Sequence, residues 1–377
     1  MLAGVARLLY RLLPKRETAV LCGRPDYCDD VLAMEKALDG TRVRKVAILT
    51  HSAAAAAAGH RYPGLSPRTI AVSKRSLRGV FHLLTAKYAF FTHSFPMQRF
   101  PDSVVSVNLW HGMPVKRVGW MTQSGSLLPN ARYAVATSEF WAVVIQESLR
   151  PSEQTLVTGL PRNDRLLLGE RGVLSALGGA PGSGDRMIAW LPTYRTVGSG
   201  RSRSAHCSHV LGLSAEALGG LNDLLETNNT VLVVKRHPLA AEEDTPELSH
   251  IRYITDEWLE ERGLTLHELL GESTALVTDV SSAYVDYLIL DRPIVHHFPD
   301  VQEYGSSRGY SITPIEDYLA GPLAVDPAGL TEALAAVLAG KDTHAEVRRG
   351  VRELFHQHVD GSASERVLAS LGLGADT

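Results

Sequence analysis

Three short segments place imidazole, basic and hydroxyl side chains directly after apolar, strand-like runs. The first, NLWHGMPVKRVG (108–119), contains Trp110 and His111, followed by Lys116 and Arg117. A neutral imidazole at the end of a strand can act as a general base toward a hydroxyl group. A single histidine is more often structural, but the adjacent tryptophan and glycine and the two cations that follow favour a catalytic role for His111.

The second segment, KRHP (235–238), also ends an apolar run. It brings Lys235, Arg236 and His237 together where a loop or helix begins. Three adjacent hydrogen-bond donors suit a diphosphate, because its oxygens accept from ammonium, guanidinium and imidazolium groups. The alternative is a solvated basic turn without a ligand.

The third segment, TDVSSAYVDYLILDRP (278–293), places Thr278, Ser281 and Ser282 at a strand-to-helix junction. Hydroxyl groups and helix N-terminal amides bind anions, although the same residue types also serve as ordinary helix caps. Asp286 lies within the predicted helix, facing either a cleft or the core.

Four further polar segments follow strands or form late turns. GLPRND (159–164) carries Asn163 and Asp164, and WLPTYR (190–195) carries Arg195 at the head of a basic loop. Arg308 lies in the turn RGY (308–310), and DGSASER (360–366) is a second polar turn. Each has a weaker signal than the first three segments.

Short β-rich runs alternate with helical patterns along the chain, which predicts parallel sheets covered by helices on both faces. The predicted strands are 18–23, 43–50, 69–73, 87–93, 103–110, 133–137, 155–159, 187–192, 230–238, 251–255, 274–279 and 293–298. The predicted helices are 29–38, 53–58, 75–86, 214–227, 265–271, 281–290, 328–339 and 343–358.

A Gly-, Pro- and Ser-rich stretch at 172–185 interrupts this alternation and reads as a hinge. We therefore expect an N-terminal α/β domain at 1–175 and a second α/β domain at 185–345. A C-terminal helix and tail at 346–377 would pack back toward the first domain. Ligands of doubly wound sheets bind beyond the carboxyl ends of the strands, so the active site is expected in the interdomain cleft.

Composition excludes several classes of protein. The 377 residues are 45% hydrophobic and 21% charged, which is ordinary for a folded chain. Three cysteines without a Cys-x-x-Cys pair exclude a disulfide scaffold and make a thiolate zinc site unexpected. No stretch of 18 apolar residues occurs, and neither a dinucleotide-binding nor a P-loop glycine signature is present.

The net charge of −3 conceals an asymmetry. Residues 1–117 hold 18 Lys and Arg against 7 Asp and Glu, whereas residues 118–377 hold 20 against 34. A basic first third indicates an anionic partner. Nucleic acid is disfavoured because the basic residues are scattered without a recognised binding module.

The N-terminal segment MLAGVARLLYRLLPKR has leucines at helical spacing with basic residues between them. This pattern predicts a basic amphipathic helix ending near Pro14, of the kind that lies in the headgroup region of an anionic membrane. The alternative is a surface helix packed on its own domain. Arg7 and Arg11 interrupt the apolar run, which argues against a signal peptide.

Taken in order, these segments resemble the CDP-glycerol glycerophosphotransferase family of teichoic acid and capsule synthesis. The resemblance rests on Trp-His-Gly-x-Pro-x-Lys-Arg, Pro-Arg-Asn-Asp, Pro-Thr-x-Arg, His-Pro, Thr-Asp-x-Ser-Ser and Asp-Gly-x-Ala-Ser-Glu-Arg. In this chain they lie at 110–117, 161–164, 192–195, 237–238, 278–282 and 360–366. Met113 and Tyr194 depart from the usual pattern, which leaves the acceptor and product length open.

The resemblance implies a GT-B-like fold of two doubly wound Rossmann-like domains. The domain at 1–175 would face the acceptor and the membrane, and the domain at 185–345 would bind the nucleotide donor. It implies transfer of glycerol phosphate from CDP-glycerol, or of another polyol phosphate from a CDP-polyol, to a cell-envelope hydroxyl with release of CMP. By position, His111 looks like the general base and His237 like the histidine that stabilises the diphosphate. The donor set is Arg195, Lys235, Arg236, Thr278, Ser281, Ser282, Asp286 and Arg308.

The acceptor or cleft set is Trp110, Lys116, Arg117, Asn163 and Asp164. No cofactor and no metal are expected, because no carboxylate pair has an evident metal-binding spacing. The expected partners are a lipid-linked or polymeric phosphate-bearing acceptor and an anionic membrane, and the expected location is the cytoplasmic side, peripheral on the inner face of the membrane. A nucleotide-sugar GT-B glycosyltransferase and a non-catalytic anionic-polymer-binding protein are the alternatives.

Overall fold

The structure is a computed structural model. It describes residues 2–62, 64–122, 128–169, 172–178, 186–192, 213–236, 247–299, 301, 305 and 309–374. Contacts divide the chain into two compact units. The first comprises Met1–Leu168, Thr265–His267 and Glu353–Thr377, and the second comprises Gly169–Leu264 and Glu268–Arg352. The chain therefore returns to its first unit at the C-terminal end, while the domain limits expected from the sequence stay predictions.

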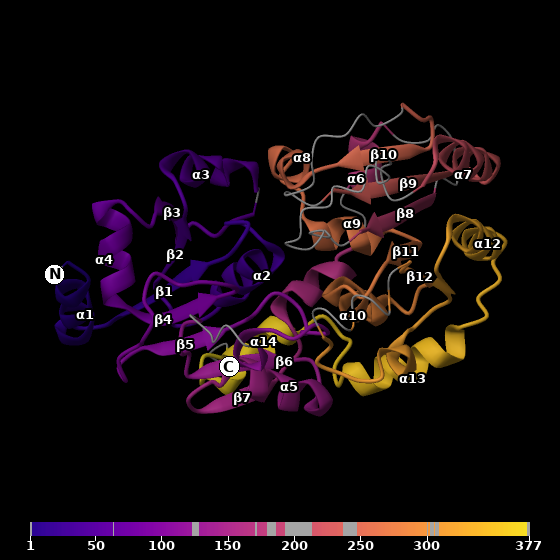
Figure 1. Cartoon of the computed structure of the whole chain (residues 1–377). Coiled ribbons are helices and arrows are strands. Elements are labelled where there is room, and N and C mark those ends of the chain that lie inside the picture. The colour runs from indigo at the N-terminus through magenta and orange to yellow at the C-terminus, as the bar shows by residue number, and fades with distance from the viewer. Residues whose placement is uncertain are drawn as a thin grey trace, which may run out of the picture. The chain divides into compact units, whose positions relative to one another are not determined.

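The first unit is built on a seven-stranded parallel sheet of order β3-β2-β1-β4-β5-β6-β7 (Figure 1). Its strands are β1 Arg16–Cys22, β2 Lys45–Thr50, β3 Thr69–Ser73, β4 Ala86–Phe91, β5 Val105–Asn108, β6 Tyr133–Ala136 and β7 Gln154–Val157. The strand order reverses between β1 and β4. Ligand crevices of such sheets form at this reversal, beyond the carboxyl ends of the strands.

Helices α1 to α5 and α14 belong to the first unit. They are α1 Leu2–Leu12, α2 Asp29–Leu38, α3 Ala53–Ala57, α4 Leu77–Thr85, α5 Glu139–Leu149 and α14 Ala363–Ser370, with 3₁₀ turns η1 Ala58–Arg61, η2 Gly119–Met121 and η3 Pro161–Leu167. Serines at 52, 76 and 138 accept a backbone N–H in the first turn of α3, α4 and α5. These N-caps explain where the three helices begin.

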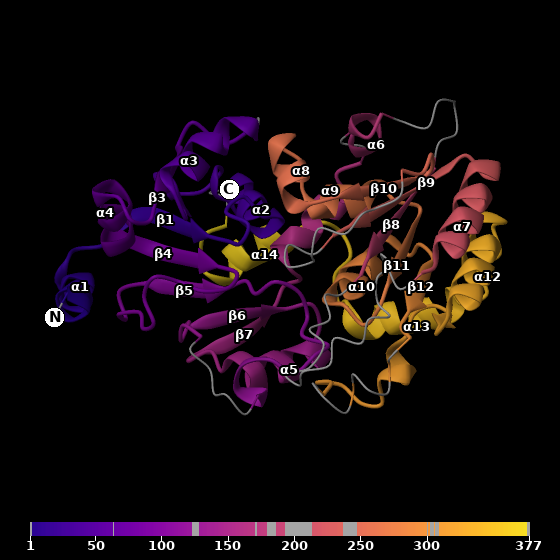
Figure 2. The same cartoon turned by 45° about the horizontal axis from the view of Figure 1, so that its top comes forward.

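The second unit has a six-stranded parallel sheet of order β10-β9-β8-β11-β12-β13 (Figure 2). Its strands are β8 Arg186–Leu191, β9 Thr230–Lys235, β10 Ile251–Ile254, β11 Ala275–Thr278, β12 Ile294–His297 and β13 Leu323–Ala324. Here the strand order reverses between β8 and β11. The predicted anion-binding segment that follows β11 begins at this reversal.

The remaining helices flank this second sheet or lead out of it. They are α6 Val173–Ala176, α7 Ala215–Thr227, α8 Asp256–Glu261, α9 Leu266–Glu272, α10 Ser282–Tyr287, α12 Pro327–Leu338 and α13 Ala345–Phe355, with 3₁₀ turns η5 Leu288–Leu290 and η6 Ile315–Tyr318. Helix α10 is followed directly by η5, so the predicted helix 281–290 is a short α-helix with a 3₁₀ end.

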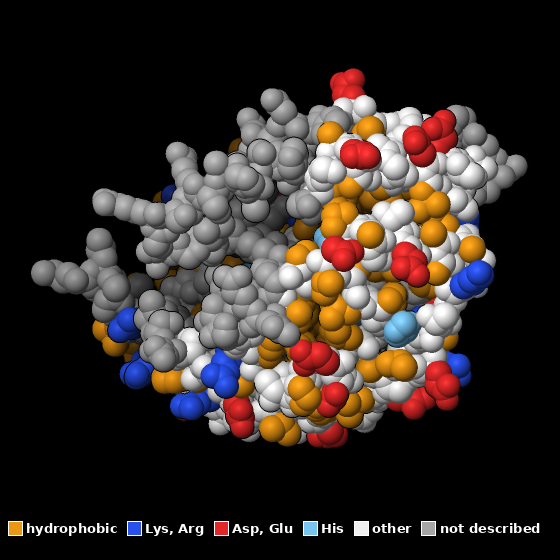
Figure 3. All heavy atoms as spheres, turned by 45° about the vertical axis from the view of Figure 1, so that its right-hand side comes forward, with side chains coloured by type: hydrophobic (Ala, Val, Ile, Leu, Met, Phe, Trp, Pro, Cys, Tyr) orange, Lys and Arg blue, Asp and Glu red, His pale blue; other side chains and the backbone are white. Residues whose placement is uncertain are grey.

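The predicted fold class, two Rossmann-like α/β units, is confirmed. Strands buried on both faces read as continuous apolar runs, as in β9, where Val231, Leu232, Val233 and Val234 are all buried. Each sheet has its own core of strand and helix side chains. On the face drawn in Figure 3, acidic side chains stand singly or in small groups between apolar and uncharged ones.

Candidate active site

His111 lies on the turn that follows β5, and the backbone of this turn is unusual. Trp110 has φ +56° and Gly112 has φ +114°. A non-glycine residue in this region costs about 1–2 kcal/mol, and such strain is concentrated at functional sites. The side-chain oxygen of Asn108 accepts a 3.0 Å hydrogen bond from the Trp110 N–H. This bond stabilises the turn that presents His111.

The hydrogen bonding of His111 identifies its tautomer. Its Nδ1 lies 3.1 Å from the backbone oxygen of Thr92. A carbonyl oxygen only accepts, so Nδ1 carries the hydrogen and Nε2 keeps a lone pair. Burial lowers the pKa of His111 to about 4, with the charge of Arg162 contributing and the Thr92 bond opposing. His111 is therefore neutral at pH 7, in the form a general base requires.

A second histidine, His93, lies against His111. The two rings are parallel within 9°, with centroids 3.8 Å apart. Burial, followed by the charges of His111, Arg24 and Arg162, lowers the pKa of His93 to about 3. His93 is not among the site residues predicted from the sequence, although it is the last residue of the predicted strand KYAFFTH (87–93). Only the pairing of β4 with β5, which sets Phe91 beside Asn108, brings the two histidines together.

Two buried aspartates begin helix α2 in the same unit. Asp29 accepts hydrogen bonds from Arg165 Nε at 3.1 Å and from His267 Nδ1 at 3.1 Å. Burial alone would raise the pKa of Asp29, but the charges and hydrogen bonds of His267 and Arg165 lower it to about 2. The cluster joins α2, η3 and the segment 265–267, which lie far apart in the sequence.

Asp30 has the opposite electrostatic behaviour. Its Oδ1 accepts a 3.1 Å hydrogen bond from the backbone N–H of Arg162. Burial raises the pKa of Asp30 to about 7, against the charges of Arg162 and His267. Arg162 itself acts electrostatically on His93 and His111, so this arginine links α2 to the histidine pair.

The predicted segments 161–164 and 360–366 meet within the first unit. Both carboxylate oxygens of Asp164 accept 2.8 Å hydrogen bonds from the N–H groups of Ala363 and Ser364, at the start of α14. Asp164 therefore has a structural role as the cap of α14. Asn163 is buried, and its side-chain N and O have no hydrogen-bond partner among the described residues.

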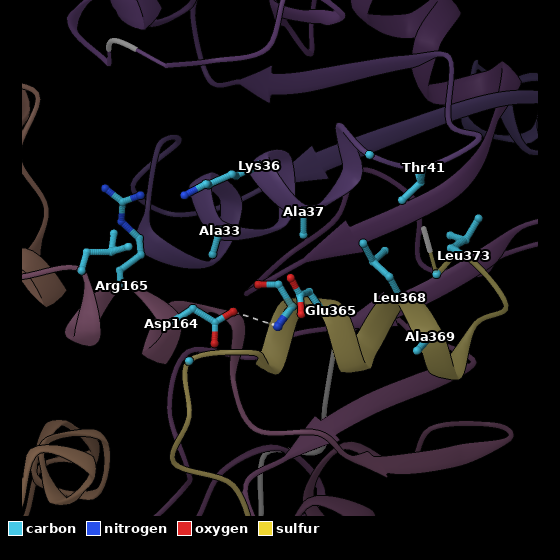
Figure 4. Close-up of a pocket in the computed structure, with 15 residues that line it drawn as sticks. Ala33, Lys36, Ala37, Thr41, Asp164, Arg165, Glu365, Leu368, Ala369 and Leu373 are labelled. Carbon is cyan, nitrogen blue, oxygen red and sulfur yellow. Dashed lines mark hydrogen bonds between the residues drawn. The ribbon is translucent and has the colours of Figure 1, made fainter. Parts of the chain in front are cut away.

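A cavity of about 610 Å³ lies beside this junction (Figure 4). Ala33, Lys36 and Ala37 of α2 line one side of it, and Leu368 and Ala369 of α14 line the other. Figure 4 shows Asp164 at one end, bonded to the first turn of α14. The cavity thus combines small apolar side chains with a few charged groups.

The remaining predicted acceptor residues lie close to His111 in the sequence. The Trp110 ring is buried, with its centroid 4.1 Å from that of His111. Lys116 is half-buried and Arg117 is exposed. Their predicted contact with an acceptor is not tested by this geometry and stays a prediction.

In the second unit, the two described cations of the KRHP segment already have interactions. Lys235 Nζ lies 2.9 Å from Asp256 Oδ1, at the start of α8. The Arg236 guanidinium lies over the ring of Tyr253, 5.0 Å from its centroid. Lys235 would have to share its charge between Asp256 and a bound anion, whereas Arg236 has no carboxylate partner in the ion pairs of the described residues.

The segment after β11 contains residues with different roles. Thr278 is fully buried, and its hydroxyl donates a 3.0 Å hydrogen bond to the backbone oxygen of Leu191. The hydroxyl thus joins β11 to β8, and the phosphate contact of Thr278 stays a prediction. Ser281 accepts from the Ala283 N–H at 3.4 Å and caps α10, while Ser282 is half-buried. Asp286 is fully buried within α10.

Three predicted site residues, Arg195, His237 and Arg308, lie outside the described residues. Among the residues that the structure describes, no group of three or more His, Cys, Asp or Glu side chains could hold a metal ion. None of the described helices has the length and apolar character needed to cross a membrane.

Comparison with known proteins places this site in a family. The family model described as CDP-Glycerol:Poly(glycerophosphate) glycerophosphotransferase matches residues 5–372. The teichoic acid ribitol-phosphate primase of Bacillus spizizenii is 25% identical over 312 residues, which are 76% of this chain and 75% of the primase. The teichoic acid glycerol-phosphate transferase of Staphylococcus aureus is 24% identical, over 70% of this chain and 69% of the transferase.

The fold has a match among solved structures. The wall teichoic acid polymerase TagF superposes with a TM-score of 0.74 at 19% identity, covering 98% of this chain and 93% of the polymerase chain. This likeness concerns the fold, whereas the family rests on the match along nearly the whole sequence. The chain belongs to the CDP-glycerol:poly(glycerophosphate) glycerophosphotransferase family and is an enzyme of the teichoic acid polyol-phosphate transferase group.

Proposed function

We propose that this enzyme transfers glycerol phosphate from CDP-glycerol to a hydroxyl group of a cell-envelope acceptor and releases CMP. The observation that carries the proposal is the state of His111, whose Nδ1–H is bonded to Thr92 and whose Nε2 is an available base. The relatives named above act on ribitol phosphate or glycerol phosphate. A CDP-ribitol donor is therefore the first competitor to test.

The proposed reaction is a single displacement at phosphorus. The acceptor hydroxyl oxygen attacks the phosphorus that bears the glycerol, and the proton of that hydroxyl passes to His111 Nε2. The bond from this phosphorus to the bridging oxygen breaks, and CMP leaves with the electron pair. A positioned base of this kind contributes about 10²–10⁴-fold to a rate.

The diphosphate of the donor needs positive charge and hydrogen-bond donors as CMP leaves. We assign this role to Arg236, with Lys235, Ser281 and Ser282 as further contacts. The resemblance adds His237 and Arg195, which lie outside the described residues. Arg236 is the best candidate, since its guanidinium stacks on Tyr253 and has no carboxylate partner among the ion pairs of the described residues.

We also propose that the first unit binds the surface of an anionic membrane, where a lipid-linked acceptor would be found. Leu8, Leu9 and Leu12 on α1 are 56%, 41% and 70% exposed. Tyr10 of the same helix is buried, so α1 packs on its own unit through one side and presents leucines on another. The packing of α1 on its own unit is one of the alternatives from the sequence, and its exposed leucines support the proposed membrane contact.

Helix α4, which lies beside α1 in Figure 1 and Figure 2, adds to this surface. Its Leu77 is 92% exposed and Phe81 is 43% exposed, with the Arg16 guanidinium 4.9 Å from the Phe81 ring centroid. Arg7, Arg11 and Arg78 are exposed on the same two helices. Apolar side chains among arginines are the composition that binds anionic headgroups.

The function is tested by CMP release from purified enzyme with a lipid-linked acceptor. CDP-glycerol, CDP-ribitol and a UDP-sugar are supplied in parallel. The proposal expects CMP from CDP-glycerol at the highest kcat/KM. Release from CDP-ribitol alone would change the donor, and turnover of the UDP-sugar alone would overturn the reaction type.

The role of His111 is tested with His111→Asn. The asparagine amide can still donate to the Thr92 oxygen, but it has no basic nitrogen. We expect CMP release to fall by about 10²–10⁴-fold with donor binding retained. A fall of less than about threefold would remove His111 from the chemistry.

A further inference from the structure

The stacked pair His93–His111 has a feature that a single general base does not require. An imidazole that accepts a proton during turnover needs a fixed ring plane, because its lone pair must point at one hydroxyl group. The Thr92 oxygen holds only one edge of the His111 ring, at Nδ1. A hydrogen bond at one edge leaves the ring able to turn about that bond.

His93 supplies the missing restraint. Its ring lies parallel to that of His111, within 9° and at a centroid distance of 3.8 Å. His93 is itself held, because its Nδ1 lies 2.9 Å from the hydroxyl of the neighbouring Thr92. Thr92 therefore connects to both rings, through its backbone oxygen to His111 and through its side chain to His93.

The sheet explains why this pair forms. Thr92 and His93 follow β4 at the point where the strand order reverses, and His111 follows the adjacent strand β5. The Leu109 N–H donates a 2.8 Å hydrogen bond to the Phe91 oxygen, and the Thr92 N–H donates to the Cys22 oxygen at 3.1 Å. Backbone hydrogen bonds therefore fix the ends of both strands, directly before the residues that carry the two imidazole rings.

We propose that His93 is a positioning residue, which fixes the ring plane of His111 by stacking and shields it from water. The catalytic part of this inference rests on the proposed function, whereas the structural part does not. His93 touches the base and not the reacting atoms, so any flat, uncharged ring at this position should serve.

The charges around the pair act in one direction. Arg24 and Arg162 both disfavour a proton on His93, and Arg162 disfavours one on His111. The backbone N–H of Arg162 donates a hydrogen bond to the Asp30 carboxyl group. Stacked imidazoles this close titrate as a pair, because the first proton opposes the second. Burial of the His111 ring, to which the stacked His93 ring contributes, thus helps keep His111 unprotonated until an acceptor delivers its proton.

Two variants separate stacking from proton transfer. His93→Phe keeps a flat ring, and His93→Ala removes it. Long-range ¹H–¹⁵N spectra of the full chain report the tautomer and titration of His111, and CMP release is measured on the same samples. His60→Ala, at an exposed histidine on η1, is the matched control.

With His93→Phe we expect the Nδ1–H tautomer and the titration of His111 to be retained, and kcat to stay within about threefold of wild type. With His93→Ala we expect the His111 titration to move toward the ordinary value of about 6.5 and kcat to fall about tenfold, with KM for CDP-glycerol little changed.

Two results would overturn the inference. Loss of kcat in His93→Phe equal to that in His93→Ala would mean that the His93 nitrogens, not its stacking, are required. An unchanged His111 tautomer and titration in His93→Ala would mean that His93 does not hold the ring. If wild type releases no CMP from any donor, the proposed function fails, while the spectra still decide the positioning role.

Discussion

The carboxylate of Asp164 binds the backbone N–H of Ser364, two hundred residues further along the chain, at 2.8 Å. Its other oxygen binds the N–H of Ala363 at the same distance. The first N–H groups of a helix have no partner within the helix, so Asp164 satisfies two of them from another part of the unit. These two hydrogen bonds explain why the segments 161–164 and 360–366 lie side by side in the fold.

Replacement of Asp164 by alanine should therefore act on stability. We expect the free energy of unfolding to fall by about 2 kcal/mol, because two buried N–H groups lose their acceptor. Chemical denaturation with urea measures this loss. The control is Glu365→Gln, at an exposed residue of the same first turn, which should change stability by less than about 0.5 kcal/mol. A variant of Asp164 with wild-type stability and no activity would contradict the capping role.

Asn163, one residue earlier, leads to the opposite expectation. Its buried amide has no partner among the described residues. A buried unpaired amide costs about 1–3 kcal/mol, which a purely structural side chain would not retain without a ligand or water. We expect Asn163→Leu to keep or raise the melting temperature and to raise KM for the acceptor about tenfold or more.

The measurement for Asn163 is acceptor-dependent CMP release beside a thermal melt. Wild-type activity in Asn163→Leu would assign the amide to a water molecule and exclude a substrate contact. A fall in melting temperature with unchanged KM would also contradict the prediction, because it would make the amide a structural group.

The sequence predicts where the strands lie in the chain, but not which strands pair with each other in the sheet. Twelve of the strands described here lie where β-rich runs predict them, while the two-residue strand β13 is too short to give a pattern. Strand order cannot be read from periodicity, so the stacking of His93 on His111 was not predictable. Helix α14 was missed for a related reason, since its cap, Asp164, is distant in sequence.

The donor segment illustrates a second limit. In the sequence, Thr278, Ser281 and Ser282 form one group of hydroxyl side chains. Successive side chains on a strand point to opposite faces, so membership of a motif does not fix where a side chain points. Thr278 is the last residue of β11, and its hydroxyl donates a hydrogen bond to the backbone oxygen of Leu191. The two serines lie beyond the end of the strand. Ion pairs between residues distant in sequence cannot be read from the sequence either, as the pair of Lys235 and Asp256 shows.

The lowered pKa of Asp29 predicts how the free energy of unfolding depends on pH in the acid range. Its pKa is about 2 in the folded protein, below the ordinary value near 3.8. The ionised form is favoured by folding, so this contribution is present above about pH 4 and is lost as pH falls toward 2. From the two pKa values, it is about 2 kcal/mol. Asp29→Asn should show a smaller loss of unfolding free energy between pH 4 and pH 3 than wild type.

Its neighbour Asp30 supplies the matched comparison with the reverse sign. The folded-state pKa of Asp30 is raised to about 7. Folding therefore favours the protonated carboxyl, and the contribution present below about pH 4 is lost as pH rises through 7. Asp30→Asn should make unfolding free energy less dependent on pH between 4 and 7, as measured by urea titrations. The same pH dependence in both variants and wild type would contradict these assignments.

The exposed side chains of α1 and α4 predict membrane binding that depends on both helices. Replacing Leu12 or Leu77 with glutamate removes an apolar contact worth about 1.5–3 kcal/mol and adds repulsion, so binding should weaken at least about tenfold. Cosedimentation with vesicles of phosphatidylglycerol and phosphatidylcholine measures it. Val143→Glu is the control, because Val143 is 63% exposed on α5. Equal loss in all three variants, or equal binding to vesicles of phosphatidylcholine alone, would show that this surface does not recognise an anionic membrane.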